Sequence, residues 1–385
     1  MSKILFIDHG MKPIGGGQIN SLNIIKGLLN HKHEIFIISF SQNDFTRQAQ
    51  ELNIFVKILQ NKKFIFDLSL RNFFKNPIKV VEALFFSIKV SLKIKQLIRE
   101  HQIEIIWPCD NLSRVITSFI SLSEKAKVIC PIMEEFPDTF VARFLRWIYL
   151  SNFDLIIPVS KKVASFFETR NTFNTSIKVI HTGIDLEKFN AHALAGDLRY
   201  ELGIPDKDII VGCIGRICNE KGQDLLLKAF SKASVKSPNL FLIFIGDGPN
   251  LKSLKNEVNN SHFQNREKIL FTGFKSDVER YINLIDICVV PSRTEASSMV
   301  ILEAGALMKP VIAFNIGGIS EMMMHDKTGF LVDPENINQM ASAINRLEDP
   351  NQRITMGLNA REFIHANFRD EIINKQINDL ISSLI

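Results

Sequence analysis

The sequence lacks the features that mark membrane-spanning, secreted and repetitive proteins. It has no uncharged apolar run of roughly 18 residues, so no membrane-spanning helix is predicted. The N-terminal run Met1–Asp8 is too short for a signal peptide and ends in an acid. Internal repeats and low-complexity tracts are also missing. These absences predict a globular protein that works in the cytoplasm.

Cysteine is scarce, and its distribution suits neither a disulfide framework nor a zinc site. The chain has five cysteines, an odd number, at positions 109, 130, 213, 218 and 288. Cys213 and Cys218 have no His or Cys partner at zinc-binding spacing. We therefore expect free thiols in a reducing compartment and no metal held by them.

The charge is modest, which argues against a nucleic-acid binder. The 385 residues are enough for two domains, and the formal net charge is +5. The first 190 residues carry 25 Lys and Arg against 17 Asp and Glu, whereas the remainder is slightly acidic. This asymmetry predicts a basic face on the N-terminal half.

Short apolar runs alternate with longer helical patterns through both halves of the chain. In the first half, the predicted strands are Lys3–Asp8, Glu34–Ser39, Ile54–Ile58, Glu104–Pro108, Lys127–Pro131, Asp154–Pro158 and Lys178–His181. In the second half, they are Ile209–Ile214, Leu240–Ile245, Lys268–Phe271, Ile285–Val290 and Pro310–Phe314. The predicted helices are Gly17–Leu29, Pro77–Glu100, Thr139–Ser151, Glu220–Lys236, Asp277–Asn283, Met299–Met308 and Ile337–Leu347. Such alternation predicts α/β domains with doubly wound parallel sheets.

The polar stretch Asn190–Lys207 separates the two alternations and predicts the domain boundary. We expect one Rossmann-like domain over residues 1–190 and a second over residues 206–368. The amphipathic segment over residues 370–385 is predicted to pack back on the first domain. Ligands of such sheets bind at the carboxyl ends of strands, so the site is expected in a cleft between the two domains.

Two glutamates stand at the mouth of an apolar helical pattern in the second half. Glu295 follows the strand-like run Ile287–Ser292, and Glu303 lies within Met299–Met308, where every other residue is apolar or small. A buried carboxylate is costly unless something binds it. On one helix the two acids would lie about 12 Å apart, too far to share one small ion. They suit the two ends of a hydroxyl-rich ligand, with a helix N-terminus between them for a phosphate.

Glycines and cations follow other predicted strands. Asp8-His9-Gly10 leads to the triplet Gly15-Gly16-Gly17, although such a triplet is more often a tight turn than a ligand loop. Arg216 and Lys221 lie in a strand-to-helix turn whose one nearby acid is Glu220. Two cations in that setting predict an anion site.

In combination these segments are similar to the retaining glycosyltransferases of family 4, which have the GT-B fold of two Rossmann-like domains. Further signatures are Pro158-Val159-Ser160, His181–Asp185 with Phe189, Gly317-Gly318 with Ser320-Glu321, and Thr328–Val332 with Pro334. The match covers nearly the whole chain. It implies transfer of a sugar from a nucleotide-diphosphate donor, most often a UDP-sugar, to a glycan or lipid-linked acceptor. Cell-surface polysaccharide or glycolipid synthesis is the setting it implies.

The resemblance also implies that the second domain holds the donor. Glu303 would accept both ribose hydroxyls, and Glu295 would bind hydroxyls of the transferred sugar. Arg216 and Lys221 would neutralise the departing diphosphate, which is the main catalytic task. The remaining implied donor contacts are backbone groups and glycines, namely Gly16, Gly17, Gly246, Ala296, Ser297, Ser298, Met299 and Val300.

We expect no metal and no cofactor, because two side-chain cations and a helix dipole serve the diphosphate. Asp206-Lys207-Asp208 has the D-x-D pattern of metal-dependent sugar transferases, but it follows Pro205 at a domain start and is interpreted as a turn. Family members retain the anomeric configuration, which implies same-face attack without an obligatory enzyme nucleophile.

Two departures from the family pattern concern the acceptor side. Many members carry a His after a strand of the first domain, but the strand ends Trp107–Asp110 and Cys130–Glu135 have none. Asp110, Glu134 or His9 could take its place, and the sequence does not choose among them. The common Gly-Phe-Gly is replaced by Ala296-Ser297-Ser298, where the serines are good helix caps.

A basic and aromatic segment over residues 57–99 predicts contact with an anionic membrane surface at the inner face of the cell membrane. It has ten Lys and Arg against two acids, with phenylalanines interleaved. Each basic side chain near such a surface contributes about 1 kcal/mol. The alternative is that Val81, Leu84, Phe85, Ile88 and Leu92 form a stripe that faces the core. The lysines would then lie outside the stripe, in solvent.

Two other functions remain open for the same fold. A catalytically impaired donor-binding or scaffold protein would explain the missing His. A sugar-nucleotide epimerase would need an acid–base pair for the sugar, and a phosphorylase would need a cofactor lysine and a longer chain. Release of a nucleoside diphosphate in the presence of acceptor separates these functions from transfer.

Overall fold

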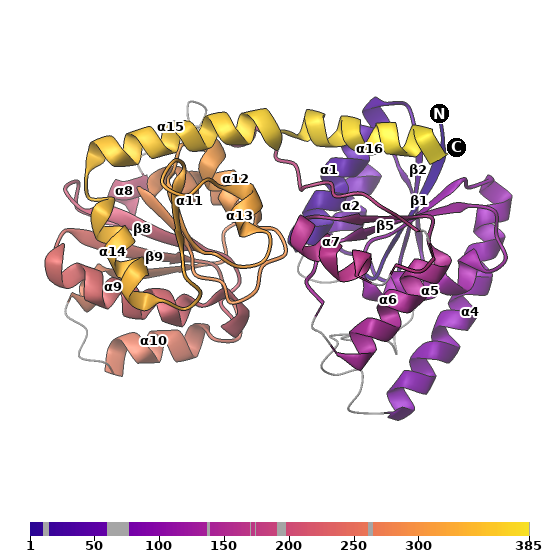
Figure 1. The fold of residues 1–385 in the computed structure, drawn as a ribbon, viewed down its shortest axis with the longest axis horizontal. Coiled ribbons are helices and arrows are strands. Elements are labelled where there is room, and N and C mark those ends of the chain that lie inside the picture. The colour runs from indigo at the N-terminus through magenta and orange to yellow at the C-terminus, as the bar shows by residue number, and fades with distance from the viewer. Residues whose placement is uncertain are drawn as a thin grey trace. The chain divides into compact units, whose positions relative to one another are not determined.

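The chain divides into two compact units. A computed structural model describes residues 1–10, 15–59, 77–136, 139–169, 171–173, 175–190, 198–260 and 265–384. Unit 1 is Met1–Gly183 together with Asp370–Ile385, and unit 2 is Ile184–Arg369 (Figure 1). The division therefore falls a few residues before the predicted linker over residues 190–206, and the C-terminal helix belongs to unit 1.

Unit 1 is built on a seven-stranded parallel sheet. Its strands are β1 (Lys3–Asp8), β2 (Glu34–Ser39), β3 (Phe55–Ile58), β4 (Ile105–Pro108), β5 (Lys127–Ile132), β6 (Leu155–Pro158) and β7 (Ser176–Ile177). Their spatial order is β3-β2-β1-β4-β5-β6-β7, so the chain direction across the sheet reverses between β1 and β4. This is the doubly wound arrangement that the alternation predicts.

The helices of unit 1 flank its sheet (Figure 1). They are α1 (Gly16–Asn30), α2 (Asp44–Glu51), α4 (Pro77–His101), α5 (Asn111–Ser121), α6 (Phe140–Asn152), α7 (Lys161–Glu168) and α16 (Asp370–Leu384). Side-chain caps start four of them, because Asn43, Asp110, Thr139 and Ser160 each accept a bond from a backbone N–H in the first turn.

Helix α16 completes the core of unit 1. Ile373, Ile377 and Ile381 recur every fourth residue and are buried in the same cluster as β1 and α1. A close contact with α1 explains Gly27, where a Cβ would overlap the side chain of Asn374. The segment over residues 370–385 thus packs on the first unit, as its amphipathic pattern indicates.

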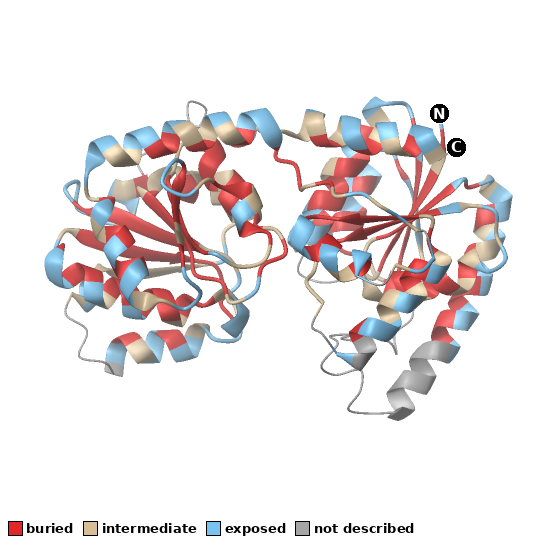
Figure 2. Ribbon diagram, viewed as in Figure 1, coloured by how far each residue is buried: buried red, intermediate tan, exposed pale blue. Residues whose placement is uncertain are grey.

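Unit 2 repeats the architecture with a six-stranded parallel sheet. Its strands are β8 (Ile209–Ile214), β9 (Leu240–Ile245), β10 (Ile269–Gly273), β11 (Ile287–Val290), β12 (Val311–Phe314) and β13 (Gly329–Val332), in the order β10-β9-β8-β11-β12-β13. Its α-helices are α8 (Leu198–Glu201), α9 (Gln223–Lys236), α10 (Leu251–Asn260), α11 (Val278–Leu284), α12 (Met299–Ala306), α13 (Ile319–Met322), α14 (Ile337–Arg346) and α15 (Pro350–Asn367). Helices cover both faces of the sheet, so its strands are buried along most of their length, except for the edge strand β10, which is half-buried throughout (Figure 2).

Some predicted boundaries are wrong for identifiable reasons. No strand forms over residues 178–181; β7 ends at Ile177, although Lys178 and Ile180 still donate backbone hydrogen bonds to β6. Helix α9 starts at Gln223 because Gly222 is left-handed, with φ 66°. Strand β13 and several helices of unit 2, α10 and α15 among them, were not predicted.

On helix α4, the described residues of the stripe that the alternative directs toward the core are exposed instead. The buried apolar side chains of the helix, among those described, are Phe86, Val90, Ile94 and Ile98. The outward stripe contains Phe85, Ile88 and Leu92, which are 71%, 43% and 62% exposed. Residues 60–76 and the side chains of residues 77–84 lie outside the described residues, and so does part of the predicted basic face. Over the described part of the chain, no helix has both the length and the apolar content that crossing a bilayer demands.

Candidate functional site

The loops after β8 and β11 meet where the strand order of unit 2 reverses. In doubly wound sheets, ligands bind outside the carboxyl ends of the strands at such a point. Strand β8 leads to Arg216 and to a 3₁₀ turn over Asn219–Lys221, and β11 leads to Glu295. Both loops that the sequence singles out for chemistry therefore lie at one edge of one sheet.

Lys221 and Glu295 form an ion pair at this edge. Lys221 Nζ donates to Glu295 Oε2 at 2.6 Å, and Ser292 Oγ donates to the same oxygen at 3.0 Å. The Glu295 side chain is 8% exposed, whereas that of Lys221 is 35% exposed. In the sequence, Glu220 is the one acid near Lys221; the fold adds Glu295 from 74 residues away. The pair orients a cation whose remaining N–H groups can reach an anion.

Arg216 supplies a second cation in the same loop. Its side chain is exposed, and it makes no hydrogen bond or ion pair with any residue that the structure describes. Its backbone carbonyl accepts a bond from Gln223 Nε2 at 3.1 Å, which ties the loop to the start of α9. The loop position is therefore fixed while the guanidinium keeps all its donors for a ligand.

Glu303 is a partly buried acid on α12 with a shifted pKa. Burial raises the pKa of Glu303 to about 7; Lys188 lowers it and Glu279 raises it. Lys188 itself pairs with Glu279, with Nζ 3.5 Å from Oε2. Among the described residues, none donates a hydrogen bond to the Glu303 carboxylate. An acid that is buried and unbonded is what a hydroxyl-rich ligand would satisfy.

The start of α12 confirms the predicted first residue of the helix but not the predicted serine cap. The helix begins at Met299, so Glu295 lies in the preceding loop and not on the helix. Ser298 occupies the N-cap position but makes no side-chain cap bond, and its N–H points to Met322 Sδ at 3.1 Å. The backbone N–H groups of Met299 and Val300 open the helix, where no intrahelical acceptor exists for them.

Two glycines near this edge are required by the packing of the loops themselves. Gly246 has φ 144°, and a Cβ there would overlap the carbonyl oxygen of Gly215. Gly222 has φ 66°, and its Cβ would overlap the carbonyl oxygen of Pro291. Close approach of backbones accounts for both residues without a ligand, so the donor contact assigned to Gly246 stays a prediction.

The glycines of the unit 1 triplet have no such explanation. A Cβ at Gly16 would meet nothing within 4 Å, and one at Gly17 would meet Met133 Sδ at 3.6 Å, over the described atoms. Neither residue has a positive φ. The fold alone therefore does not require glycine here, and the predicted close approach of a ligand to Gly16 and Gly17 remains open.

Asp8 anchors the loop that precedes this triplet. Its carboxylate accepts bonds from the Gly10 N–H at 2.8 Å and from Gln18 Nε2 at 3.1 Å. Burial, followed by the nearby charge of Asp110, raises the pKa of Asp8 to about 6. Asp8 thus couples the end of β1 to the first turn of α1.

Two of the three predicted substitutes for the missing His have side chains with structural partners. Asp110 caps α5 through the Ser113 N–H at 3.0 Å and accepts the His9 N–H at 2.7 Å. Glu134 pairs with the guanidinium of Arg114, which is 1% exposed. The His9 side chain makes no hydrogen bond with the described residues. None of the three is shown to touch a substrate, so their role remains a prediction.

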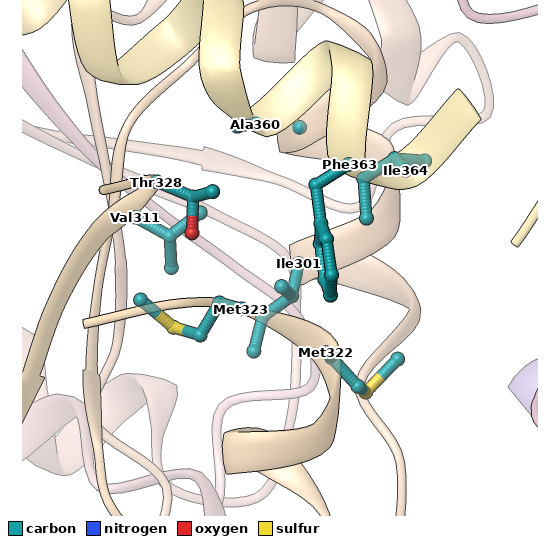
Figure 3. A pocket seen from close by; sticks show the side chains of 9 residues that line it. Ile301, Val311, Met322, Met323, Thr328, Ala360, Phe363 and Ile364 are labelled. Carbon is teal, nitrogen blue, oxygen red and sulfur yellow. The ribbon is translucent and has the colours of Figure 1, made fainter. Parts of the chain in front are cut away.

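A small pocket in unit 2 has no polar group free for a ligand among its described lining residues. The pocket lies between α12, α13, β12 and α15 and is lined by apolar side chains and Thr328 (Figure 3). The Thr328 hydroxyl is already bonded to the backbone of Met324. The five cysteines are free thiols, and the Asp206-Lys207 segment forms the expected turn.

Sequence reasoning missed the residues that hold the cations in place. Ser292 bonds Glu295, and Arg293 binds Asp224 with both of its terminal nitrogens, at 2.8 and 2.7 Å. In unit 1, Arg114 is the buried partner of Glu134. The one available signal was a serine and an arginine in the same post-strand loop as Glu295, three and two residues before it.

Comparisons with known proteins give relatives in one class of enzyme. A curated relative in Mycobacterium tuberculosis (strain CDC 1551 / Oshkosh), a GDP-mannose-dependent alpha-(1-6)-phosphatidylinositol monomannoside mannosyltransferase, is 27% identical over 317 residues, 76% of this chain and 79% of the relative. N-acetyl-alpha-D-glucosaminyl L-malate synthase of Bacillus anthracis is 30% identical over 224 residues, 58% of each chain.

Solved structures agree on the fold. The crystal structure of Anabaena HepE in complex with UDP-glucose has a TM-score of 0.82 and 24% sequence identity, and the match covers 100% of both chains. A Rickettsia africae glycosyltransferase gives a TM-score of 0.81 at 20% identity, over 98% of this chain and 97% of that one.

Two family models account for both units. "Glycosyl transferases group 1" matches residues 196–363, and "Glycosyltransferase Family 4" matches residues 14–188. Together with the paired parallel sheets and the enzyme relatives, these matches bear out the resemblance read from the motifs. The chain belongs to the family 4 glycosyltransferases and has their GT-B fold.

Proposed function

We propose that the protein transfers a hexosyl group from a nucleoside diphosphate sugar to a hydroxyl of a glycan or lipid-linked acceptor, with retention of configuration. The bond between the anomeric carbon and the β-phosphate oxygen breaks, and a bond from the acceptor oxygen to that carbon forms. The acceptor proton leaves with the departing phosphate or to solvent. The observation that carries the proposal is the Lys221–Glu295 pair, beside exposed Arg216, at the strand-order reversal of unit 2.

The two cations suit the leaving group. Negative charge grows on the diphosphate as the sugar departs, and preorganised donors there stabilise the transition state more than the ground state. Arg216 brings a guanidinium that bonds to none of the described residues, and Lys221 brings an ammonium held by Glu295. We propose that these two groups do this without a metal ion and without a cofactor. Activity in EDTA that matches activity without it would support the proposal.

The acid on α12 suits the nucleoside. Glu303 lacks a donor among the described residues, and an ionised carboxylate can accept both ribose hydroxyls. The resemblance predicts uracil as the base, whereas the mycobacterial relative uses GDP-mannose. Calorimetric titration with UDP and with GDP decides between the bases.

The central test is turnover. Purified protein is incubated with UDP- or GDP-sugars and extracted membrane lipids or oligosaccharides, and released nucleoside diphosphate is measured. Release that requires acceptor, and is abolished in Lys221→Ala and Glu295→Gln, supports transfer. Full activity in both variants would overturn the site assignment.

For the acceptor we propose a molecule held at an anionic membrane surface. Phe85, Ile88 and Leu92 lie on one exposed stripe of α4, and the exposed Lys89 and Lys93 lie beside it. The opposite face of the helix packs into unit 1, so the same helix can hold the fold and meet lipid. A lipid-linked acceptor would then reach unit 1 by diffusing within the plane of the membrane.

A vesicle experiment tests this membrane surface. Protein is sedimented with phosphatidylglycerol-containing vesicles at 50 mM salt, and Phe85→Ser/Leu92→Ser is expected to stay in the supernatant. Ile354→Ser/Leu358→Ser on α15 is the matched control, because these side chains are also exposed, at 61% and 53%. Failure of the parent to sediment, or equal loss in both double variants, would rule out α4 as the docking element.

A scaffold that binds donor without transferring sugar is the second candidate. It is favoured by the structural engagement of Asp110 and Glu134, the two acids predicted to act for the missing His. Tight nucleotide binding without turnover across a broad acceptor panel would select this function.

A further inference from the structure

Arg293 joins the two loops that carry the Lys221–Glu295 pair. It lies two residues before Glu295 and faces the turn that holds Lys221. Its backbone N–H donates to the Glu220 carbonyl at 2.8 Å, and Nη1 donates to the Asn219 carbonyl at 2.8 Å. One residue thus grips the 3₁₀ turn at two consecutive carbonyls.

The guanidinium also grips the first turn of α9. Nη1 and Nη2 donate to the two carboxylate oxygens of Asp224 at 2.8 and 2.7 Å, and Nε lies 3.3 Å from Glu335 Oε1. The Arg293 side chain is 21% exposed and that of Asp224 34% exposed, so the fork is partly shielded from water. Paired bonds of this kind fix geometry as well as distance.

We infer that Arg293 and Asp224 are positioning residues that set Lys221 against the diphosphate of the donor. The inference rests on the proposed function and deepens it. Lys221 has four rotatable bonds, and its ammonium reaches Glu295 because the backbone of the turn is pressed against the loop after β11. Gly222, packed on the Pro291 carbonyl, makes that close approach sterically possible.

This role predicts a selective effect on phosphate recognition. A displaced Lys221 would still leave the nucleoside contacts on α12 intact. The diphosphate would lose a well-placed cation, whereas a nucleoside monophosphate, which ends one phosphate earlier, would lose less. A residue that only stabilised the fold would lower the affinity for both nucleotides equally.

The experiment compares diphosphate with monophosphate binding in Arg293→Lys, Asp224→Asn and the double variant. Affinities for UDP, UMP, GDP and GMP are measured by calorimetry at a temperature below the melting transition of each variant. Each single variant is expected to lose about tenfold in affinity for the diphosphate and less than about twofold for the monophosphate. The double variant is expected to lose no more than a single one, because the two residues act as a pair.

Arg353→Lys is the matched control. Arg353 also spans two backbone carbonyls, of Leu347 and Glu348, at 2.6 and 2.8 Å, but it does so at the start of α15. In this variant, the ratio of the affinity for the diphosphate to the affinity for the monophosphate is expected to equal that of the parent, even if the melting temperature falls.

The outcomes separate this inference from the proposed function. A parent that binds no nucleoside diphosphate defeats the proposed function and the inference together. A parent that prefers diphosphate, with variants that keep the same preference, defeats only the positioning role. A preference that shrinks in Arg293→Lys and Asp224→Asn, and not in Arg353→Lys, supports it.

Discussion

Glu303→Gln should stabilise the protein and at the same time remove a pH-dependent part of nucleotide binding. The pKa of Glu303 is raised by burial from 4.5 to about 7, so the folded protein holds this proton more tightly than the unfolded chain does. The resulting stability is fully present below pH 4.5 and is lost as the pH rises through 7. A difference of about 2.5 pKa units corresponds to about 3 kcal/mol of unfolding free energy.

Binding changes in the opposite direction. If the ribose hydroxyls require the carboxylate, about half of the protein is competent at pH 7 and about a tenth at pH 6. Apparent affinity should then fall about fivefold between pH 7 and pH 6. Glutamine cannot titrate and cannot offer two acceptor oxygens, so Glu303→Gln should bind weakly with no such step.

Two measurements check this trade-off. Urea unfolding at pH 5 and pH 8 should show the stabilisation of Glu303→Gln over the parent at pH 8 and little of it at pH 5. Calorimetry with UDP and GDP at both pH values gives the affinity, and the variant corrects for titration of the ligand phosphate, whose pKa is about 6. Equal stability of parent and variant at pH 8, or equal pH dependence of binding, would refute the assignment of Glu303 as the buried acceptor.

Three further variants probe other parts of the molecule. Asp8→Asn should gain stability over the parent as the pH rises from 4 to 7.5, because the raised pKa of about 6 makes ionised Asp8 a cost in the folded state; a constant difference in urea unfolding would contradict this. Gly222→Ala should cost about 2 kcal/mol or more, since φ is 66° and a Cβ overlaps the Pro291 carbonyl, whereas Gly203→Ala, with φ 65° and open space, should cost less in the same thermal melts. Lys221→Ala should reduce sugar transfer far more than it changes the melting temperature, and a parallel loss of both would place Lys221 among structural residues only.

Much of the fold follows from the sequence because buried parallel strands are continuous apolar runs. Runs such as Leu240–Ile245 have no competing interpretation, and the structure buries all six residues. Strand β13 was missed because it starts with a glycine and spans four residues, a pattern that also fits a turn. On α4, Phe85 and Phe86 are adjacent, so two apolar stripes compete, and only tertiary contacts show which one faces the core.

The individual residues of the site could be predicted from the sequence, but the contacts between them could not. Glu295, Arg216 and Lys221 stand out as polar residues after apolar strands, and the family resemblance gave each a role. Their mutual arrangement depends on strand order, because β8 and β11 are neighbours in space although three strands apart in sequence numbering. Arg293 and Asp224 were missed for that reason. Taken separately, an arginine in a loop and an aspartate in the first turn of a helix give no sign of a functional role.

The route of the chain through the two units has a consequence for synthesis on the ribosome. Unit 2 is one continuous segment of the chain. Unit 1 instead needs residues 370–384, because Ile373, Ile377 and Ile381 cover apolar side chains of α1. Translation runs from the N-terminus, and domains generally fold as they emerge. Here unit 1 is synthesised first but cannot complete its core until the last helix has been made. A nascent chain, or one clipped at the C-terminus, would therefore expose an incompletely folded unit 1 to chaperones while unit 2 is already folded.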